Sequence, residues 1–70
     1  MIAPLRRALE SKEKIQIVYL DKNGKYTQRY VTVLALNDRH AICYCHYRKQ
    51  YRMFKLDNIL AVAYGKKSIG

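Results

Sequence analysis

Short runs of strand-forming residues, each followed by a tight turn, constrain the fold of this chain more than any other feature. The clearest turn is Asn23-Gly24, which lies between two runs rich in β-branched and aromatic residues. Asn-Gly in that position is the strongest short-range signal for a β-hairpin. Further turns are expected at 37–39 and 48–50. The sequence therefore predicts five strands, at 15–20, 26–36, 40–47, 51–55 and 60–64.

A helix is expected before the first strand, over residues 4–14. Pro4 suits the first turn of a helix, and Leu5, Ala8 and Leu9 recur at helical spacing. A helix of about ten residues is marginal alone, so the Leu5/Leu9 stripe must dock on the strands. Asp57 is expected to cap a short helical turn before the last strand.

One short helix and five strands joined by tight turns predict a mainly β fold, a small closed or nearly closed barrel. Closure removes sheet edges, which is valuable in so small a chain. Seventy residues make a single domain, with no room for a deep substrate cavity. We expect the helix within 1–14, the barrel within 15–64 and a flexible basic tail at 65–70.

The charge balance is strongly positive, with 14 Lys and Arg against 5 Asp and Glu, a net charge of +9. Such a surplus favours phosphates, acidic partners or anionic surfaces, although solubility alone explains it equally well. The N-terminus has no signal-peptide pattern, and no segment approaches the length of an apolar membrane span. We therefore expect a cytoplasmic protein that does not contact a membrane.

The two cysteines, Cys43 and Cys45, are one residue apart. Side chains at i and i+2 of a strand lie about 6–7 Å apart, which is too far for a disulfide. Alternation also places His46 on the opposite face from both thiols, and no second cysteine pair is present to complete a zinc site. We expect no metal and no other cofactor, and we interpret the cysteines as small core residues.

Residues suited to catalysis are sparse. The carboxylates are scattered over the helix and the turns, and Cys45 and His46, as neighbours in a strand, point opposite ways. The sequence therefore predicts a protein that is not an enzyme.

The order and spacing of several short motifs resemble those of the bacterial WYL domain. The matching segments are Ile17-Val18-Tyr19, Arg29-Tyr30-Val31, Tyr44-Cys45-His46-Tyr47-Arg48 and the block from Arg52 to Ile59. That block is the most specific, because Phe54, Leu56, Asp57 and Ile59 fall on the family signature. Two departures stand out. The naming Trp-Tyr-Leu triplet is replaced by Arg39, His40 and Ala41, and Val33 replaces an expected proline.

This resemblance implies an SH3- or Sm-like barrel. It also implies a ligand-sensing module of transcription regulators, whose ligands are expected to be nucleic-acid in nature, including single-stranded DNA or nucleotides. Most relatives also carry a helix-turn-helix domain, and this chain shows none, so we expect no sequence-specific promoter binding by the domain itself.

The main candidate site is the aromatic and basic hairpin from His46 to Arg52. No acidic residue occurs between 39 and 56, and basic residues there alternate with tyrosines. A basic groove with aromatic faces is an economical way to hold single strands, whereas the alternative is a solvated hairpin tip with tyrosines packed on the barrel. The predicted site residues are Tyr44, His46, Arg48 and Arg52, joined by Tyr19 and Arg29 from neighbouring strands.

Two classes of function remain open. The first is a binding module for a nucleotide or single-stranded nucleic acid, with regulatory output through a partner protein. The second is a protein-interaction module, in which the Leu5/Leu9 helix or an open barrel edge mediates homo-oligomers or docks to an acidic partner.

Overall fold

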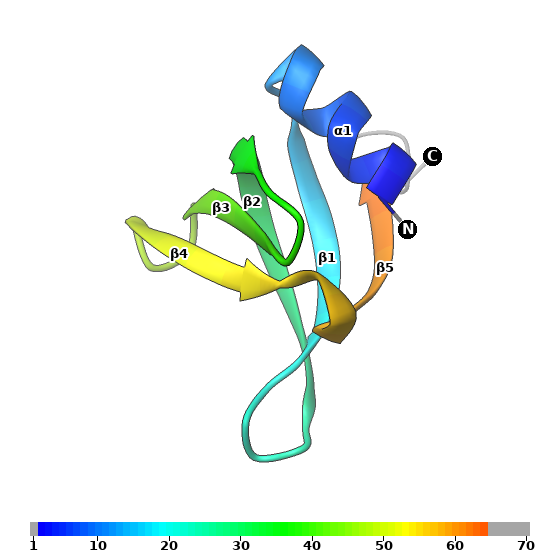
Figure 1. Cartoon of the computed structure of the whole chain (residues 1–70). Helices are drawn as coiled ribbons and strands as arrows, with labels where there is room; N and C mark the ends of the chain where they lie inside the picture. The colour runs from blue at the N-terminus through cyan, green and yellow to red at the C-terminus, as the bar shows by residue number, and fades with distance from the viewer. Residues whose placement is uncertain (1, 65–70) are drawn as a thin grey trace.

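The fold consists of one helix followed by five strands. The computed structural model describes residues 2–64. Helix α1 (Ile2–Ser11) precedes β1 (Lys14–Leu20), β2 (Tyr26–Leu36), β3 (His40–Cys45), β4 (Gln50–Lys55) and β5 (Ile59–Tyr64), with a 3-10 turn η1 (Leu56–Asn58) between the last two strands (Figure 1). Every predicted strand is present, and the bounds of β2 match the prediction. The predicted tail at 65–70 lies outside the described residues.

The strands form one antiparallel sheet in the order β4-β3-β2-β1-β5. The mainly β prediction is therefore confirmed. The predicted barrel was closed or nearly closed, and the pairing does not close it. Within residues 2–64, β4 and β5 are the two edges of the sheet and are not hydrogen-bonded to each other. Turn η1 carries the chain from one edge of the curved sheet to the other, where β5 pairs with β1 (Figure 1). The sheet therefore stays open between β4 and β5 in the described part of the chain.

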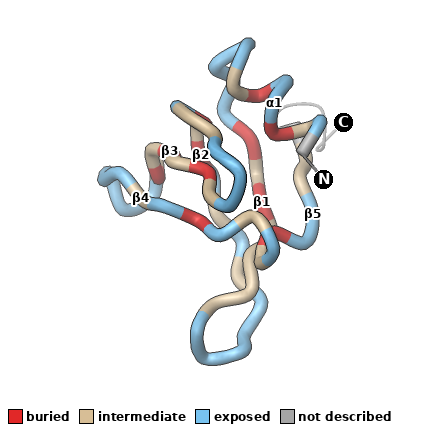
Figure 2. The backbone as a smooth tube through the Cα atoms, in the orientation of Figure 1, coloured by how far each residue is buried: buried red, intermediate tan, exposed pale blue. Residues whose placement is uncertain are grey.

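The core lies on one face of the sheet, which we call the inner face. Strict alternation along β1 and β3 sends Ile15 and Ile17, and then Cys43 and Cys45, to this face, where all four are buried (Figure 2). Phe54 from β4 is buried among them, at 1% exposure. The prediction that both cysteines are core residues is confirmed. Free, buried thiols pack here as small apolar groups.

Helix α1 contributes Leu5 and Ala8 to the same core, and Leu9 packs against it. The predicted docking of the helical stripe is confirmed. The helix ends at Ser11 rather than at residue 14, because Lys12 adopts a left-handed conformation with φ 59°. The Lys12 N–H donates to the Ala8 carbonyl at 2.9 Å, which is a common way to terminate a helix.

The predicted β1–β2 hairpin is present, but its loop spans 21–25 and is wider than a two-residue turn. Gly24 is left-handed, with φ 81°. One carboxylate oxygen of Asp21 accepts hydrogen bonds from the N–H groups of Asn23 and Lys25, each at 2.9 Å. Asp21 therefore shapes this loop together with the Asn-Gly pair.

Two local predictions were wrong. Asp57 does not cap η1, because the cap position is Lys55 and no side-chain hydrogen bond caps the turn. Strand β3 ends at Cys45 rather than at residue 47, because 46–49 form a loop closed by a 2.7 Å hydrogen bond from the Lys49 N–H to the Cys45 carbonyl. Lys49 adopts φ 57° to close this loop.

Candidate functional site

The six predicted site residues divide between the two faces of the sheet. Tyr19, Arg29 and Arg52 share the inner face with the core, because each lies two positions from a buried residue of its strand. Tyr44 and His46 lie on the opposite, outer face, and Arg48 is exposed in the 46–49 loop. The structure therefore arranges these residues as two groups rather than as one.

The inner group is organised around the ring of Phe54. Tyr19, from β1, meets this ring edge to face with centroids 4.8 Å apart. The guanidinium carbon of Arg52, from β4, lies 5.8 Å from the centre of the same ring. That separation falls within the range of cation–π attraction. Phe54 is therefore both a core residue and the support that holds Tyr19 and Arg52 together at the rim of the core.

Arg29 lies beside this group on β2. It is directly opposite Ile17, so Tyr19 is its diagonal neighbour on the same face, at about 7–8 Å between backbones. Its Nε atom is buried and has no hydrogen-bond partner among the described residues. Buried polar atoms are paired in the great majority of cases, and an unpaired donor is costly. Arg29 therefore carries a buried Nε–H that no described residue accepts, on the inner face of a positively charged protein.

The outer group is a row of rings that crosses β3 and β4. Tyr44 lies at its centre and meets His46 and Tyr51 edge to face, at centroid distances of 5.2 and 5.3 Å. Tyr51 is directly opposite Tyr44 in the β3–β4 register. We call His46, Tyr44 and Tyr51 the outer aromatic row. Tyr51 lies in the predicted hairpin but was not among the predicted site residues, and the strand register identifies it as a member of the row.

His46 is anchored by two contacts, although it lies just beyond β3. Its Nε2 atom is 2.7 Å from the hydroxyl oxygen of Thr32, and its backbone N–H donates to the Tyr30 carbonyl at 2.9 Å. Thr32 faces Tyr44 across the β2–β3 pairing. The sequence offered no signal for Thr32, because its role depends on a contact between residues fourteen positions apart.

Exposure along the row increases toward the edge strand. Tyr44 is half-buried, whereas Tyr51 is 71% exposed. Tyr47, in the adjacent loop, is 81% exposed and is followed by the exposed side chains of Arg48 and Lys49. The outer face thus combines accessible ring faces with nearby positive charge.

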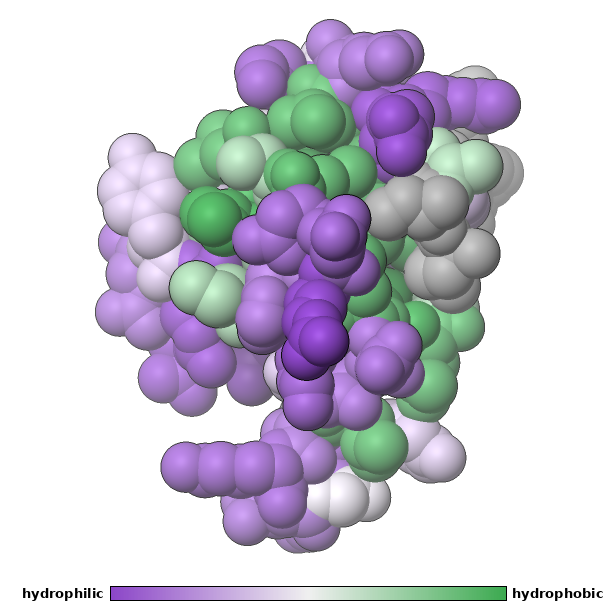
Figure 3. Space-filling view, in the orientation of Figure 1, coloured by the Kyte–Doolittle hydropathy of each residue, from purple (hydrophilic) through white to green (hydrophobic). Residues whose placement is uncertain are grey.

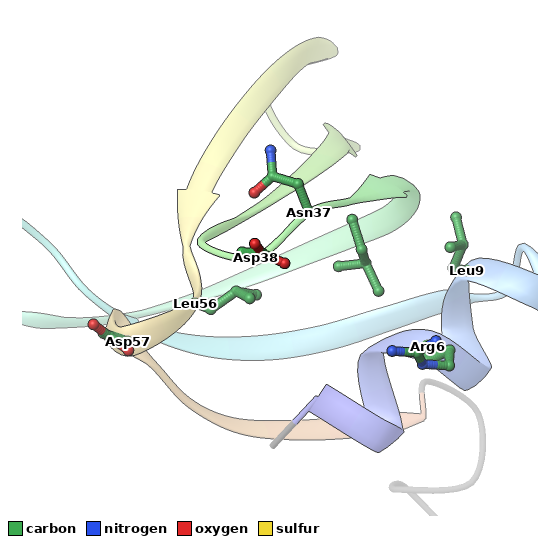
Figure 4. Close-up of a pocket in the computed structure, with 7 residues that line it drawn as sticks. Arg6, Leu9, Asn37, Asp38, Leu56 and Asp57 are labelled. Atoms are coloured by element: carbon green, nitrogen blue, oxygen red, sulfur yellow. The ribbon is translucent and has the colours of Figure 1, made fainter.

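A groove of about 480 Å³ lies elsewhere, between α1, the β2–β3 turn and η1 (Figure 4). Leucines 9, 36 and 56 line it, together with the charged residues Arg6, Asp38 and Asp57. None of the predicted site residues lines this groove. It contains two of the five acidic residues of the chain, and their charge disfavours a phosphate ligand there.

The thiols and the histidine do not form a reactive or metal-binding cluster. Burial, and secondarily the neighbouring Cys45, raises the pKa of Cys43 to about 12, so its thiol stays protonated at neutral pH. Among residues 2–64, no three His, Cys, Asp or Glu side chains lie close enough to share a metal ion. No helix in the same range is both long and apolar enough to cross a membrane.

Comparison with known proteins identifies the family. The domain model described as "WYL domain" matches residues 1–64. Proteasome accessory factor B/C (PafBC) of Arthrobacter aurescens has a similar fold, with a TM-score of 0.74 and 20% sequence identity; the match covers 99% of this chain but only 12% of that one. No curated protein sequence matches the chain. Because the family model covers nearly the whole sequence, this chain belongs to the WYL domain family.

Proposed function

We propose that this domain is a non-catalytic module that binds a nucleotide or a single-stranded nucleic acid, and that binding is linked to transcriptional regulation. WYL domains are ligand-binding regulatory modules. The observation that carries the proposal is the buried Nε of Arg29, which has no hydrogen-bond partner within residues 2–64. An anionic oxygen is the natural acceptor for such a donor in a chain with a net charge of +9.

The inner group supplies the phosphate contacts. Arg29 on β2 and Arg52 on β4 share the inner face with Tyr19. The planar fork of a guanidinium matches two phosphate oxygens at once, which a lysine ammonium does not do. Phe54 holds the Arg52 guanidinium near its ring, which lowers the entropy lost when a ligand binds.

The outer aromatic row supplies the stacking surface. Bases stack on exposed tyrosine rings whatever their sequence, with a typical contribution of about 1–3 kcal/mol per base. Tyr51 is the most accessible ring of the row, and Tyr44 on the neighbouring strand meets it edge to face. Arg48 and Lys49 lie in the adjoining loop, where they attract the nucleic-acid backbone.

Strand β4 connects the two groups. Tyr51 and Arg52 are neighbours on this edge strand, so their side chains point to opposite faces. A single strand that crosses the β4 edge contacts both faces, whereas a mononucleotide reaches only one. This arrangement favours a single-stranded nucleic acid over a free nucleotide.

Fluorescence anisotropy with labelled oligo-dT, oligo-U and a labelled mononucleotide, at two salt concentrations, tests the proposal. We expect the oligonucleotides to bind more tightly than the mononucleotide and to bind less tightly as salt rises. Failure of every probe to bind at low salt would refute the proposed function.

Variants locate the site. Arg52→Ala and Arg48→Ala are expected to weaken binding more than Lys22→Ala, a matched control that removes one charge from the exposed 21–25 loop. Arg29→Lys keeps the charge but removes the Nε donor, and we expect it to weaken binding as well. Equal effects of Arg52→Ala and Lys22→Ala would mean that only net charge matters.

The alternative is a protein-interaction module without a nucleic-acid ligand. The observation in its favour is that, within the described residues, β4 and β5 are edge strands, each with one side that pairs with no other strand. The α1 stripe does not support it, because Leu5 is 1% exposed and packs into the core of its own domain. Absence of nucleic-acid binding, together with a concentration-dependent oligomer in sedimentation, would favour this alternative.

A further inference from the structure

The two edge strands of the sheet differ in chemistry. Strand β4 carries Arg52 and Lys55, and charges of this kind discourage pairing with another strand. Strand β5 reads Ile-Leu-Ala-Val-Ala-Tyr and contains neither a charge nor a proline. In a chain with 14 basic residues, an uncharged edge of six residues is the exception.

The main chain of β5 is available for pairing. Within residues 2–64, β5 pairs only with β1, so every second residue directs its N–H and C=O away from the sheet. The register shift near Leu60 is confined to the start of the strand, and 61–64 pair with β1 in unbroken register. Leu60 is 45% exposed and Ala61 is also exposed. Hydrophobic residues are visible along β5 at the right of the space-filling view (Figure 3).

We propose that β5 is the edge through which two copies of this domain pair, antiparallel and about a two-fold axis, to form one continuous sheet. A two-fold axis places the same strand on both sides of the seam, so the contact is self-complementary. Pairing through β4 would bring Arg52 and Lys55 of both copies together along one seam. Pairing through β5 brings no charged strand residue to the seam and places the uncharged edge of each copy against the other.

This dimer has a salt dependence opposite to that of nucleic-acid binding. Two domains of net charge +9 repel each other at a distance, and salt screens that repulsion. Dimerisation through β5 is therefore expected to strengthen as salt rises, whereas binding to an oligonucleotide weakens. The two proposals are independent, and this contrast separates their outcomes.

Sedimentation velocity on the full chain, over a wide concentration range and at two salt concentrations, tests the dimer. The variant Ala61→Lys adds a charge at an exposed position of β5, and Met53→Lys adds the same charge at an exposed position of β4, the other edge. We expect Ala61→Lys to weaken dimerisation at least tenfold and Met53→Lys to leave it unchanged. Far-UV circular dichroism verifies that both variants fold.

Hydrogen exchange gives a second measurement that requires no substitution. Amides of β5 that point away from β1 are expected to exchange more slowly at dimer concentrations, while amides at the β4 edge do not change. A wild-type chain that stays monomeric at every concentration and salt would overturn the proposal. So would a dimer that Met53→Lys disrupts as strongly as Ala61→Lys, or one whose protected amides lie in β4.

Discussion

The rings of Tyr19 and Phe54 meet edge to face at 4.8 Å, although β2 and β3 separate their strands in the sheet. This contact is possible only because the sheet curls until β1 and β4 face each other across the core. Within residues 2–64 the ladder remains open between β4 and β5, so at this point side chains rather than backbone hydrogen bonds join β1 to β4. The stability of the curl therefore depends in part on this aromatic pair, alongside the rest of the buried core.

A double-mutant cycle measures that dependence. Tyr19→Leu and Phe54→Leu each remove one ring, and we expect a coupling of about 0.5–1.5 kcal/mol between the two substitutions. Urea unfolding monitored by circular dichroism gives the four free energies. Tyr19→Phe, which keeps the ring, is the control and is expected to retain the coupling. Strictly additive losses would show that the rings merely lie near each other.

Lys12 is strained at the end of α1, where its φ is 59°. Glycine adopts this conformation without the steric cost of a Cβ, so Lys12→Gly is expected to stabilise the protein by about 1 kcal/mol. Lys12→Ala loses the same charge but keeps the Cβ, and we expect no comparable gain. Thermal unfolding of the three proteins is the measurement, and equal melting temperatures for the glycine and alanine variants would contradict the explanation.

Asp21 and Asp57 form a matched pair of turn carboxylates with different expected roles. Asp21 accepts two backbone hydrogen bonds in the 21–25 loop, so Asp21→Ala is expected to cost about 1 kcal/mol. Asp57 caps no helix, so Asp57→Ala is expected to stay within about 0.5 kcal/mol of wild type. Denaturant midpoints of the two variants measure both losses of stability. A larger loss for Asp57→Ala than for Asp21→Ala would support the capping role that the sequence suggested for Asp57.

Cys43 links stability to alkaline pH. Burial raises its pKa to about 12 from the ordinary value of 9.0, so the folded protein keeps the thiol protonated where the unfolded chain ionises it. The stabilising effect is complete below about pH 9 and declines by about 1.4 kcal/mol per pH unit above it. Urea unfolding between pH 8 and 10.5 is expected to show a steeper decline for wild type than for Cys43→Val. Parallel pH profiles would contradict this linkage.

Tyr51 tests the outer aromatic row directly. If bases stack on it, Tyr51→Ala weakens oligonucleotide binding by about 1–3 kcal/mol. Tyr26 is the control, because it is similarly exposed, at 68% against 71%, but lies at the far end of β2. Anisotropy titrations are expected to leave Tyr26→Ala close to wild type. An equal loss of oligonucleotide affinity in the two variants would show that the outer aromatic row is not part of the binding site.

Much of the local structure follows from the sequence. Alternation in 40–45 predicted which face carries Cys43 and Cys45, and Asn23-Gly24 predicted the first hairpin. Such features depend on neighbours within a few positions, so they can be read from residue order. The packing of Leu5 into the core was predictable for the same reason, since a lone short helix must bury its apolar stripe.

The tertiary structure decided which residues share a site. The sequence by itself determined that tyrosines and arginines gather in one hairpin and that alternation divides them between two faces. The curl of the sheet and the strand register decided that Tyr19 and Arg52 meet the ring of Phe54, and that Tyr51 meets Tyr44. The contact of His46 with Thr32, and the seam left open beside β5, depend on register and on the accumulated twist of five strands. Those quantities are sums over the whole sheet, and no local pattern encodes them.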